Sequence, residues 1–90
     1  MGMVTEVGNY KNMTATGAVT TRAGSLLGFY VNSTSSGTIV FTDNAGSVAM
    51  SGTITPAIGF HRFPATFGAG GLNVTIANTL NVTIFYVPAQ

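Results

Sequence analysis

The last part of the chain, Leu72 to Val87, reads LNVTIANTLNVTIFYV, and apolar and polar residues alternate strictly within 72–76 and again within 80–84. A period of two is typical of a β-strand with one buried face. The pentapeptide Leu-Asn-Val-Thr-Ile occurs twice, at 72–76 and 80–84, with Ala-Asn-Thr between the copies. This pattern predicts a β-hairpin with a three-residue loop at 77–79, in which Asn78 takes a left-handed conformation.

The predicted hairpin places six apolar side chains on one buried face: Leu72, Val74, Ile76, Leu80, Val82 and Ile84. A two-residue loop would mix the faces, so the register is well specified, with Val74 opposite Val82. We expect the Asn/Thr face to be solvated, with a polar interface or a glycan-contacting surface as the alternative. Phe85 and Val87 break the alternation on that face, so we expect a neighbouring subunit or the N-terminal segment to cover them.

The rest of the chain reads as further short strands separated by turns. Strand-like composition occurs at 13–21, 25–32, 38–43, 48–55 and 60–63. Gly17 and Gly52 weaken two of these strands, and Pro64 is expected to end the last one. No segment has a helical period, and loops are expected between the strands, including one at 33–37.

Seven or eight short strands of this kind predict an all-β fold, either a small antiparallel β-sandwich or a small barrel. We expect the sandwich, and eight strands in two four-stranded sheets would make it a jelly roll. With 90 residues, the chain has room for one such domain. We place the domain at residues 18–90. Residues 1–17 are polar and weakly patterned, and are expected to form an N-terminal arm that is extended or partly ordered.

Composition adds one strong constraint, which is the scarcity of charge. Charged residues make up 6% of the chain and hydrophobic residues 46%, whereas about a quarter of a typical soluble domain is charged. The regular apolar pattern excludes disorder. Proline, glycine and the two-residue period after residue 63 argue against a membrane-spanning helix. Because interface cores are depleted of Lys, Glu and Asp, this composition suits a protomer of a larger assembly.

The chain offers few residues for catalysis or metal binding. His61 is the only histidine, Glu6 and Asp43 are the only carboxylates, and cysteine is absent. A zinc site needs three or four ligands, and a Ser-His-Asp triad needs an acid beside its base. We therefore expect no enzyme activity, no metal, no cofactor and no small-molecule substrate. A net charge of +1 provides no basic patch for nucleic acid, and we expect no membrane partner.

If the chain is part of an assembly, its interface residues are expected among the aromatic residues and the arginines, because arginine is the charged residue that interfaces tolerate best. Arg62 lies between Phe60 and Phe63, where it can stack or pair across subunits. The residues that we expect at a subunit or partner interface are Tyr10, Lys11, Arg22, Phe60, His61, Arg62, Phe63, Phe85 and Val87.

Four segments of the chain resemble small all-β proteins encoded among the virion structural genes of tailed bacteriophages. These segments are GSLLGFYVN, TIVFTDNAGS, TITPAIGFHRFPATF and GGLNVTIANTLNVTIFYVP. The resemblance implies a capsid decoration (cement) protein, typically a small β-sandwich that sits as a trimer on the outer shell and fastens neighbouring capsomers. It implies the major capsid protein and further copies of the chain as partners, and it implies no catalytic residues.

Two other roles stay open from the sequence. A receptor- or glycan-binding module of a phage fibre would carry exposed aromatic residues. A neck or tail structural subunit would assemble with a symmetry other than threefold.

Overall fold

The computed structural model describes residues 9–43 and 48–88. These residues form six β-strands and no helix, and all six strands belong to one antiparallel sheet. The strands are β1 (Asn9–Met13), β2 (Gly17–Thr20), β3 (Gly24–Asp43), β4 (Val48–Ala49), β5 (Gly59–Phe67) and β6 (Leu72–Pro88). The prediction of an all-β antiparallel fold is confirmed, whereas the expected seven or eight strands in two four-stranded sheets are not. Within the described residues, no helix has the length and hydrophobicity needed to cross a membrane.

Two long strands, β3 and β6, pair along almost their whole lengths and form the centre of the sheet. Their register runs from Gly24 opposite Pro88 to Asp43 opposite Leu72. Strands β1 and β2 pair with the free side of β6, whereas β4 and β5 pair with the free side of β3. Every other strand therefore depends on the β3–β6 pair for its place.

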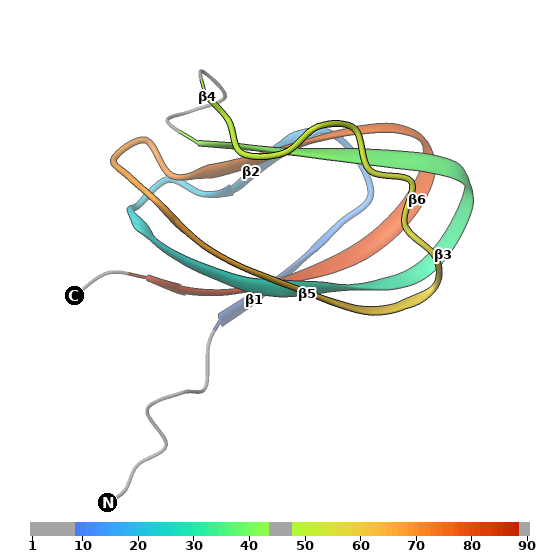
Figure 1. Cartoon of the computed structure of the whole chain (residues 1–90), viewed down its shortest axis with the longest axis horizontal. Helices are drawn as coiled ribbons and strands as arrows, with labels where there is room; N and C mark the ends of the chain where they lie inside the picture. Colours follow the sequence, from blue (N-terminus) through green and yellow to red (C-terminus); the bar gives the residue numbers. More distant parts are fainter. Residues whose placement is uncertain (1–8, 44–47, 89–90) are drawn as a thin grey trace, which may run out of the picture.

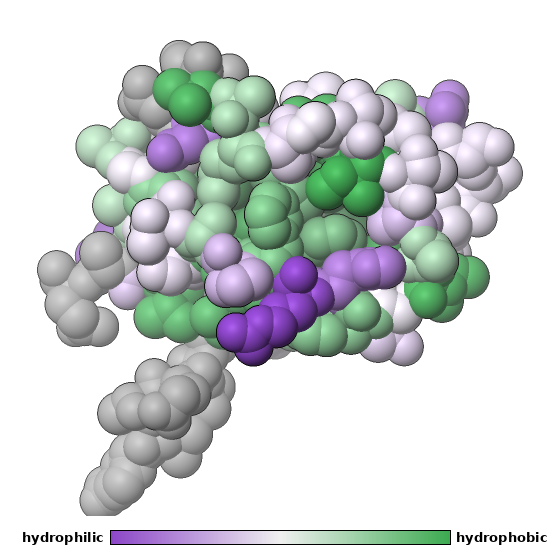
Figure 2. Space-filling model, viewed as in Figure 1, coloured by the Kyte–Doolittle hydropathy of each residue, from purple (hydrophilic) through white to green (hydrophobic). Residues whose placement is uncertain are grey.

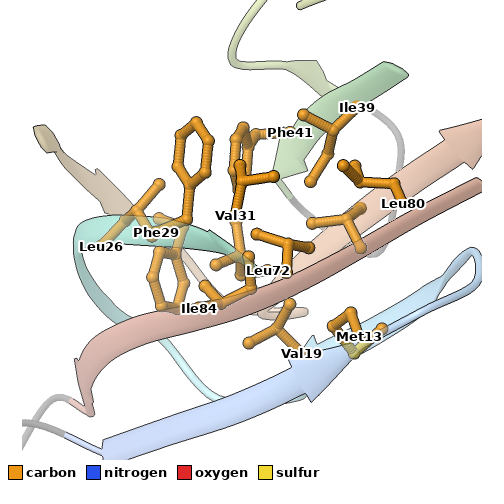
Figure 3. Packing of buried hydrophobic residues seen from close by; sticks show 13 residues of the cluster. Met13, Val19, Leu26, Phe29, Val31, Ile39, Phe41, Leu72, Leu80 and Ile84 are labelled. Atoms are coloured by element: carbon orange, nitrogen blue, oxygen red, sulfur yellow. The ribbon is translucent and has the colours of Figure 1, made fainter. Parts of the chain in front are cut away.

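The β3–β6 pair turns back on itself, so that the sheet forms two facing layers (Figure 1). The first layer holds β1, the C-terminal half of β6, the N-terminal half of β3, and β5. The second layer holds β2, the N-terminal half of β6, the C-terminal half of β3, and β4. Apolar side chains from both layers meet in the space between them (Figure 3).

The prediction of a β-hairpin at the C-terminal end of the chain is wrong. Both Leu-Asn-Val-Thr-Ile copies lie in the single strand β6, and each copy pairs with β3 instead of with the other copy. Ile76 lies opposite Ile39, and Val82 lies opposite Val31. Strict alternation fits a hairpin and a bent strand equally well, so periodicity alone did not distinguish them.

The predicted inward face of this segment is confirmed, although the two copies reach it from opposite layers. Five of its apolar residues are buried with 2% exposure or less: Leu72, Val74, Leu80, Val82 and Ile84. The sixth, Ile76, is partly buried against the same core. The left-handed conformation predicted for Asn78 is also confirmed, with φ at 62°.

The sheet bends where residues 33–37 of β3 lie beside residues 77–79 of β6, and we call these residues the crease. Ser36 and Asn78 both have a positive φ there. The Asn78 side-chain nitrogen donates a hydrogen bond of 2.8 Å to the carbonyl oxygen of Ser36. Asparagine tolerates a left-handed backbone better than most residues. The segment that was expected to be a loop is therefore the bend of a continuous strand.

Two neighbouring features accompany the bend of the sheet at the crease. A side chain at Gly37 would collide with the carbonyl oxygen of Thr79, so the two strands approach closely because glycine is present. Beside them, the chain also bends at 14–16, between β1 and β2. The Thr16 hydroxyl accepts a hydrogen bond from the Ile76 amide at 2.9 Å and lies 3.2 Å from the Ile76 carbonyl oxygen, to which it can donate.

Two further strand predictions need correction. Pro64 does not end a strand, because β5 continues to Phe67. Proline is compatible with an edge strand, where no partner requires its missing N–H, and the register of β3 against β5 shifts beside Pro64, between Leu26 and Gly28. The strand expected at 48–55 is reduced to the two residues of β4 and an isolated bridge between Ile54 and Ile39.

Part of the expected N-terminal arm belongs to the sheet. Residues 9–13 form β1, and Met13 is buried in the core. The sheet therefore begins before the domain boundary expected at residue 18. The remainder of the arm that precedes β1, residues 1–8, lies outside the described residues.

We predict that Asn78→Ala lowers the free energy of unfolding by about 2 kcal/mol. It removes the hydrogen bond to Ser36 and places a β-carbon in a left-handed conformation. Asn78→Gly loses the same hydrogen bond without the backbone strain, so its loss should be smaller, about 1 kcal/mol. Urea unfolding of the three proteins measures the difference. An alanine variant as stable as the glycine variant would show that the crease does not need the left-handed conformation.

Candidate functional site

The edge of the molecule formed by β4, residues 50–58 and β5 is rich in apolar side chains. Figure 1 draws these segments in front, and Figure 2, from the same direction, shows hydrophobic residues across the centre of this face. Ile58 is 64% exposed and Val48 is also exposed. Met50, Ile54 and Phe63 are partly buried against the core. We call these five residues the apolar edge.

The backbone of the apolar edge is only partly paired among the described residues. The isolated bridge between Ile54 and Ile39 consists of two hydrogen bonds of 2.9 Å, and the Met50 amide donates to the carbonyl oxygen of Phe41. A free strand edge can accept a further strand. Pro64 lacks an N–H in the middle of β5, so strand addition there is interrupted. Contact through side chains is the chemistry that this edge favours.

The four candidate residues of β5 divide between two faces, in agreement with the alternation in the sequence. Phe60 and Arg62 are exposed on the outer face of the first layer, whereas His61 and Phe63 are half-buried. Arg62 therefore follows the pattern of the outer face and is adjacent in sequence to Phe63 of the apolar edge.

His61 helps to close this edge of the core. Its ring stacks on Phe29, with the ring centroids 5.1 Å apart. Its Nε2 atom lies 2.7 Å from the carbonyl oxygen of Ala57. Next to it, the ring of Phe63 meets Phe41 edge-on at a centroid distance of 5.2 Å. These contacts give His61 and Phe63 a structural role, as well as a place beside the apolar edge.

Aromatic residues from four strands gather on the outer face of the first layer. They are Tyr10 of β1, Phe85 of β6, Tyr30 of β3 and Phe60 of β5, and we call them the aromatic face. Tyr10 is 73% exposed and Phe60 is 57% exposed. Tyr10 lies opposite Phe85, Tyr30 lies opposite Phe60, and the rings of Phe60 and Phe85 are 6.2 Å apart.

Gly28 explains how these rings come together. It lies opposite Phe85 on one side and Arg62 on the other. A side chain at this position would collide with the carbonyl oxygen of His61 and with the ring of Phe60. The absence of a side chain at Gly28 therefore lets the Phe60 ring lean across β3 toward Phe85.

Beside the aromatic face lies a hydrogen-bonded group of polar residues. It consists of Asn12 of β1, Asn32 of β3, and Asn81 and Thr83 of β6, and we call it the amide ladder. The side-chain nitrogen of Asn12 donates to the Asn81 side-chain oxygen at 2.7 Å, and that of Asn32 donates to the same oxygen at 3.2 Å. Both nitrogens also donate to the Thr83 hydroxyl oxygen, at 3.2 and 3.1 Å.

The remaining candidates lie in different places, so the nine residues do not form one site. Val87 is half-buried in β6, and Arg22 is exposed in the turn between β2 and β3. Lys11 lies opposite the buried Ile84, which directs it toward the inner side of edge strand β1. An inward-pointing charge on an edge strand disfavours the addition of another strand. The cover expected over Phe85 comes in part from within the chain, from β1 and the Phe60 ring.

Several residues of these surfaces are not among the nine interface residues predicted from the sequence. Tyr30 is one of them, yet it is exposed. Asn12, Asn32 and Asn81 are each followed, two positions later, by Thr or Ser. That spacing does not show that the three converge on one face, because they come from three different strands.

The side chains at these surfaces are suited to noncovalent contact with a partner or ligand. Among the described residues, no group of three or more His, Cys, Asp or Glu side chains could hold a metal ion. In the same part of the chain, every buried polar side-chain atom has a hydrogen-bond partner. Apolar side chains, ring faces and amide groups are what the surface presents.

Comparison of the chain with protein-family models, with curated proteins and with solved structures found no match. The resemblance to virion structural proteins therefore rests on the four sequence segments given above.

We predict that Asn81→Ala lowers the free energy of unfolding by about 1 kcal/mol, because it removes the acceptor shared by Asn12 and Asn32. Thr75→Ala, on an exposed position of the other layer, is the matched control and should change stability by less than about 0.5 kcal/mol. Urea unfolding checks both values. Equal effects of the two substitutions would show that the amide ladder adds nothing to stability.

Proposed function

We propose that this protein is a non-enzymatic capsid decoration protein, which binds the assembled outer shell of a tailed bacteriophage as a homotrimer. The observation that carries the proposal is the apolar edge, where Ile58 and Val48 are exposed and continue into the partly buried Met50 and Ile54. An exposed apolar surface rimmed by polar residues marks a protein contact. In the proposed trimer, this edge contacts neighbouring copies, and the major capsid protein lies beneath them on the surface of the virion.

The arrangement of the strands supports this proposal. When the halves of β3 and β6 are counted separately and residues 48–54 are counted as one segment, eight segments lie in two layers of four. Eight strands in two facing sheets are the arrangement of a jelly roll, a fold used by many viral capsid domains. We propose that the fold is a jelly roll of this kind, built from one sheet that bends at the crease.

The scarcity of charge supports an assembled state. Three of the five charged residues are Lys11, Arg22 and Arg62, and Arg62 is exposed and adjacent in sequence to Phe63 of the apolar edge. An arginine at the rim of an apolar contact can pair with a carboxylate of the partner in a fixed geometry. A decoration protein acts by mass action: it binds the assembled lattice better than free capsomers, and many such sites together stabilise the shell.

We predict that cryo-electron microscopy of virions from the phage encoding this chain shows the protein on the outer shell at threefold positions. The fold, with extents of 42 × 28 × 16 Å, can be fitted directly into such density. Density at the neck or tail would favour a different structural role. Absence of the protein from virions would overturn the proposal.

We predict that the isolated protein has three times the chain mass of 9.2 kDa in light scattering. Ile58→Ser and Arg62→Ala should each shift it toward the monomer, because they remove an apolar contact and a rim charge. Thr75→Ala is again the control and should keep the wild-type mass. A monomeric wild-type protein would count against the trimer. Unchanged mass and thermal stability in both variants would remove the apolar edge from the interface.

A further inference from the structure

We propose that the aromatic face and the amide ladder together form a binding site for an uncharged oligosaccharide. This site goes beyond the decoration role and lies on a different surface from most of the apolar edge. In the proposed trimer, the copies contact one another through the apolar edge, so most of the outer face of the first layer is not used for contact between copies.

The two groups are contiguous in the register of the sheet. Tyr10, Phe85 and Gly28 form one row across the strands, and Asn12, Thr83 and Tyr30 form the next row. Rows on one face of a strand are about 6.8 Å apart, and adjacent strands are about 4.8 Å apart. Ring faces and amide groups are therefore direct neighbours, close enough for one small ligand to contact both.

The aromatic face suits the apolar side of a sugar ring. Sugar rings present C–H groups on one side, and such groups pack favourably on the negative face of an aromatic ring. Tyr10 and Phe60 stand out from the surface, whereas Phe85 is half-buried between them. Gly28 adds no side chain between Phe85 and Phe60. The result is a shallow apolar platform with rings on both sides.

The amide ladder suits the hydroxyl groups of a sugar. Its internal bonds use the side-chain nitrogens of Asn12 and Asn32 and the side-chain oxygen of Asn81. The side-chain oxygens of Asn12 and Asn32 and the side-chain nitrogen of Asn81 have no hydrogen-bond partner among the described residues. In the same part of the chain, the hydroxyl groups of Tyr10 and Tyr30 also have none. Sugar hydroxyls both donate and accept, so they match this mixture of donors and acceptors. The internal bonds hold the amides in place before a ligand arrives.

The charge of the face selects the class of ligand. Arg62, at the β5 side, is the charged residue on the outer face of this layer among the described residues, and Lys11 is directed to the inner side. A single arginine is not the basic patch that binding of a polyanion requires. An uncharged ligand requires no such patch. A second copy of the chain is the alternative occupant, and the test below separates it from sugar binding.

The test is affinity electrophoresis of the full chain through gels that contain dextran, mannan or galactan, with polygalacturonate as a charged comparison. We expect at least one uncharged polysaccharide to retard the protein and polygalacturonate not to do so. Tyr10→Ala combined with Tyr30→Ala should weaken the retardation at least tenfold in apparent affinity. Thr75→Ala, an exposed position of the other layer that is expected to keep the oligomer, should bind like the wild type.

Circular dichroism and unfolding midpoints establish that the tyrosine variant is folded; because both residues are exposed, we expect it to be. If the pair were to unfold the protein, Tyr10→Ala alone serves as the variant. Absence of retardation by all three uncharged polysaccharides, or equal retardation of the variant and the wild type, would overturn the site. So would loss of the oligomer in the tyrosine variant without any polysaccharide binding, since that would assign the aromatic face to protein contact. The decoration role would be unaffected by each of these outcomes.

Discussion

The pairing of β3 with β6 along their whole lengths is the constraint on which the rest of the structure depends. This long antiparallel pair buries its apolar face by folding over at the crease, where the register shifts by one residue between Ser35 and Ser36. Asn78 and Ser36 supply the left-handed conformations at the bend, joined by a side-chain hydrogen bond. The fold is thus one bent sheet whose own halves enclose the core (Figure 1).

The bend also determines which surfaces the molecule presents. Each side of the β3–β6 pair carries short strands, and these leave two exposed edges and two outer faces. On the β1 edge, the inward-pointing Lys11 opposes addition of a strand. On the opposite edge, Pro64 and the apolar residues around Ile58 favour contact through side chains. The outer face of the first layer combines aromatic rings with amides, so one small chain has two surfaces of different chemistry.

The candidate site was predictable only where it lies within one strand. The alternation of Phe60 to Phe63 correctly separates exposed from half-buried residues. Around Phe85, where the alternation breaks, the structure places β1 and the Phe60 ring, and contact with a neighbouring subunit stays a prediction. The aromatic face as a whole was not predictable, because Tyr10 and Phe85 are far apart in sequence and meet only through the β1–β6 register. The irregular pairing near Gly28 likewise changes which side chains share a face.

The sequence by itself determined the local character of this protein: an all-β chain, a buried set of Leu, Val and Ile side chains in Leu72–Pro88, and a left-handed Asn78. These properties follow from periodicity and from the conformational preferences of single residues. Only the tertiary structure decided that the two repeats lie in opposite layers and pair with β3. A hairpin and a folded strand bury the same side chains, so their difference is a matter of long-range pairing, which a local pattern does not contain.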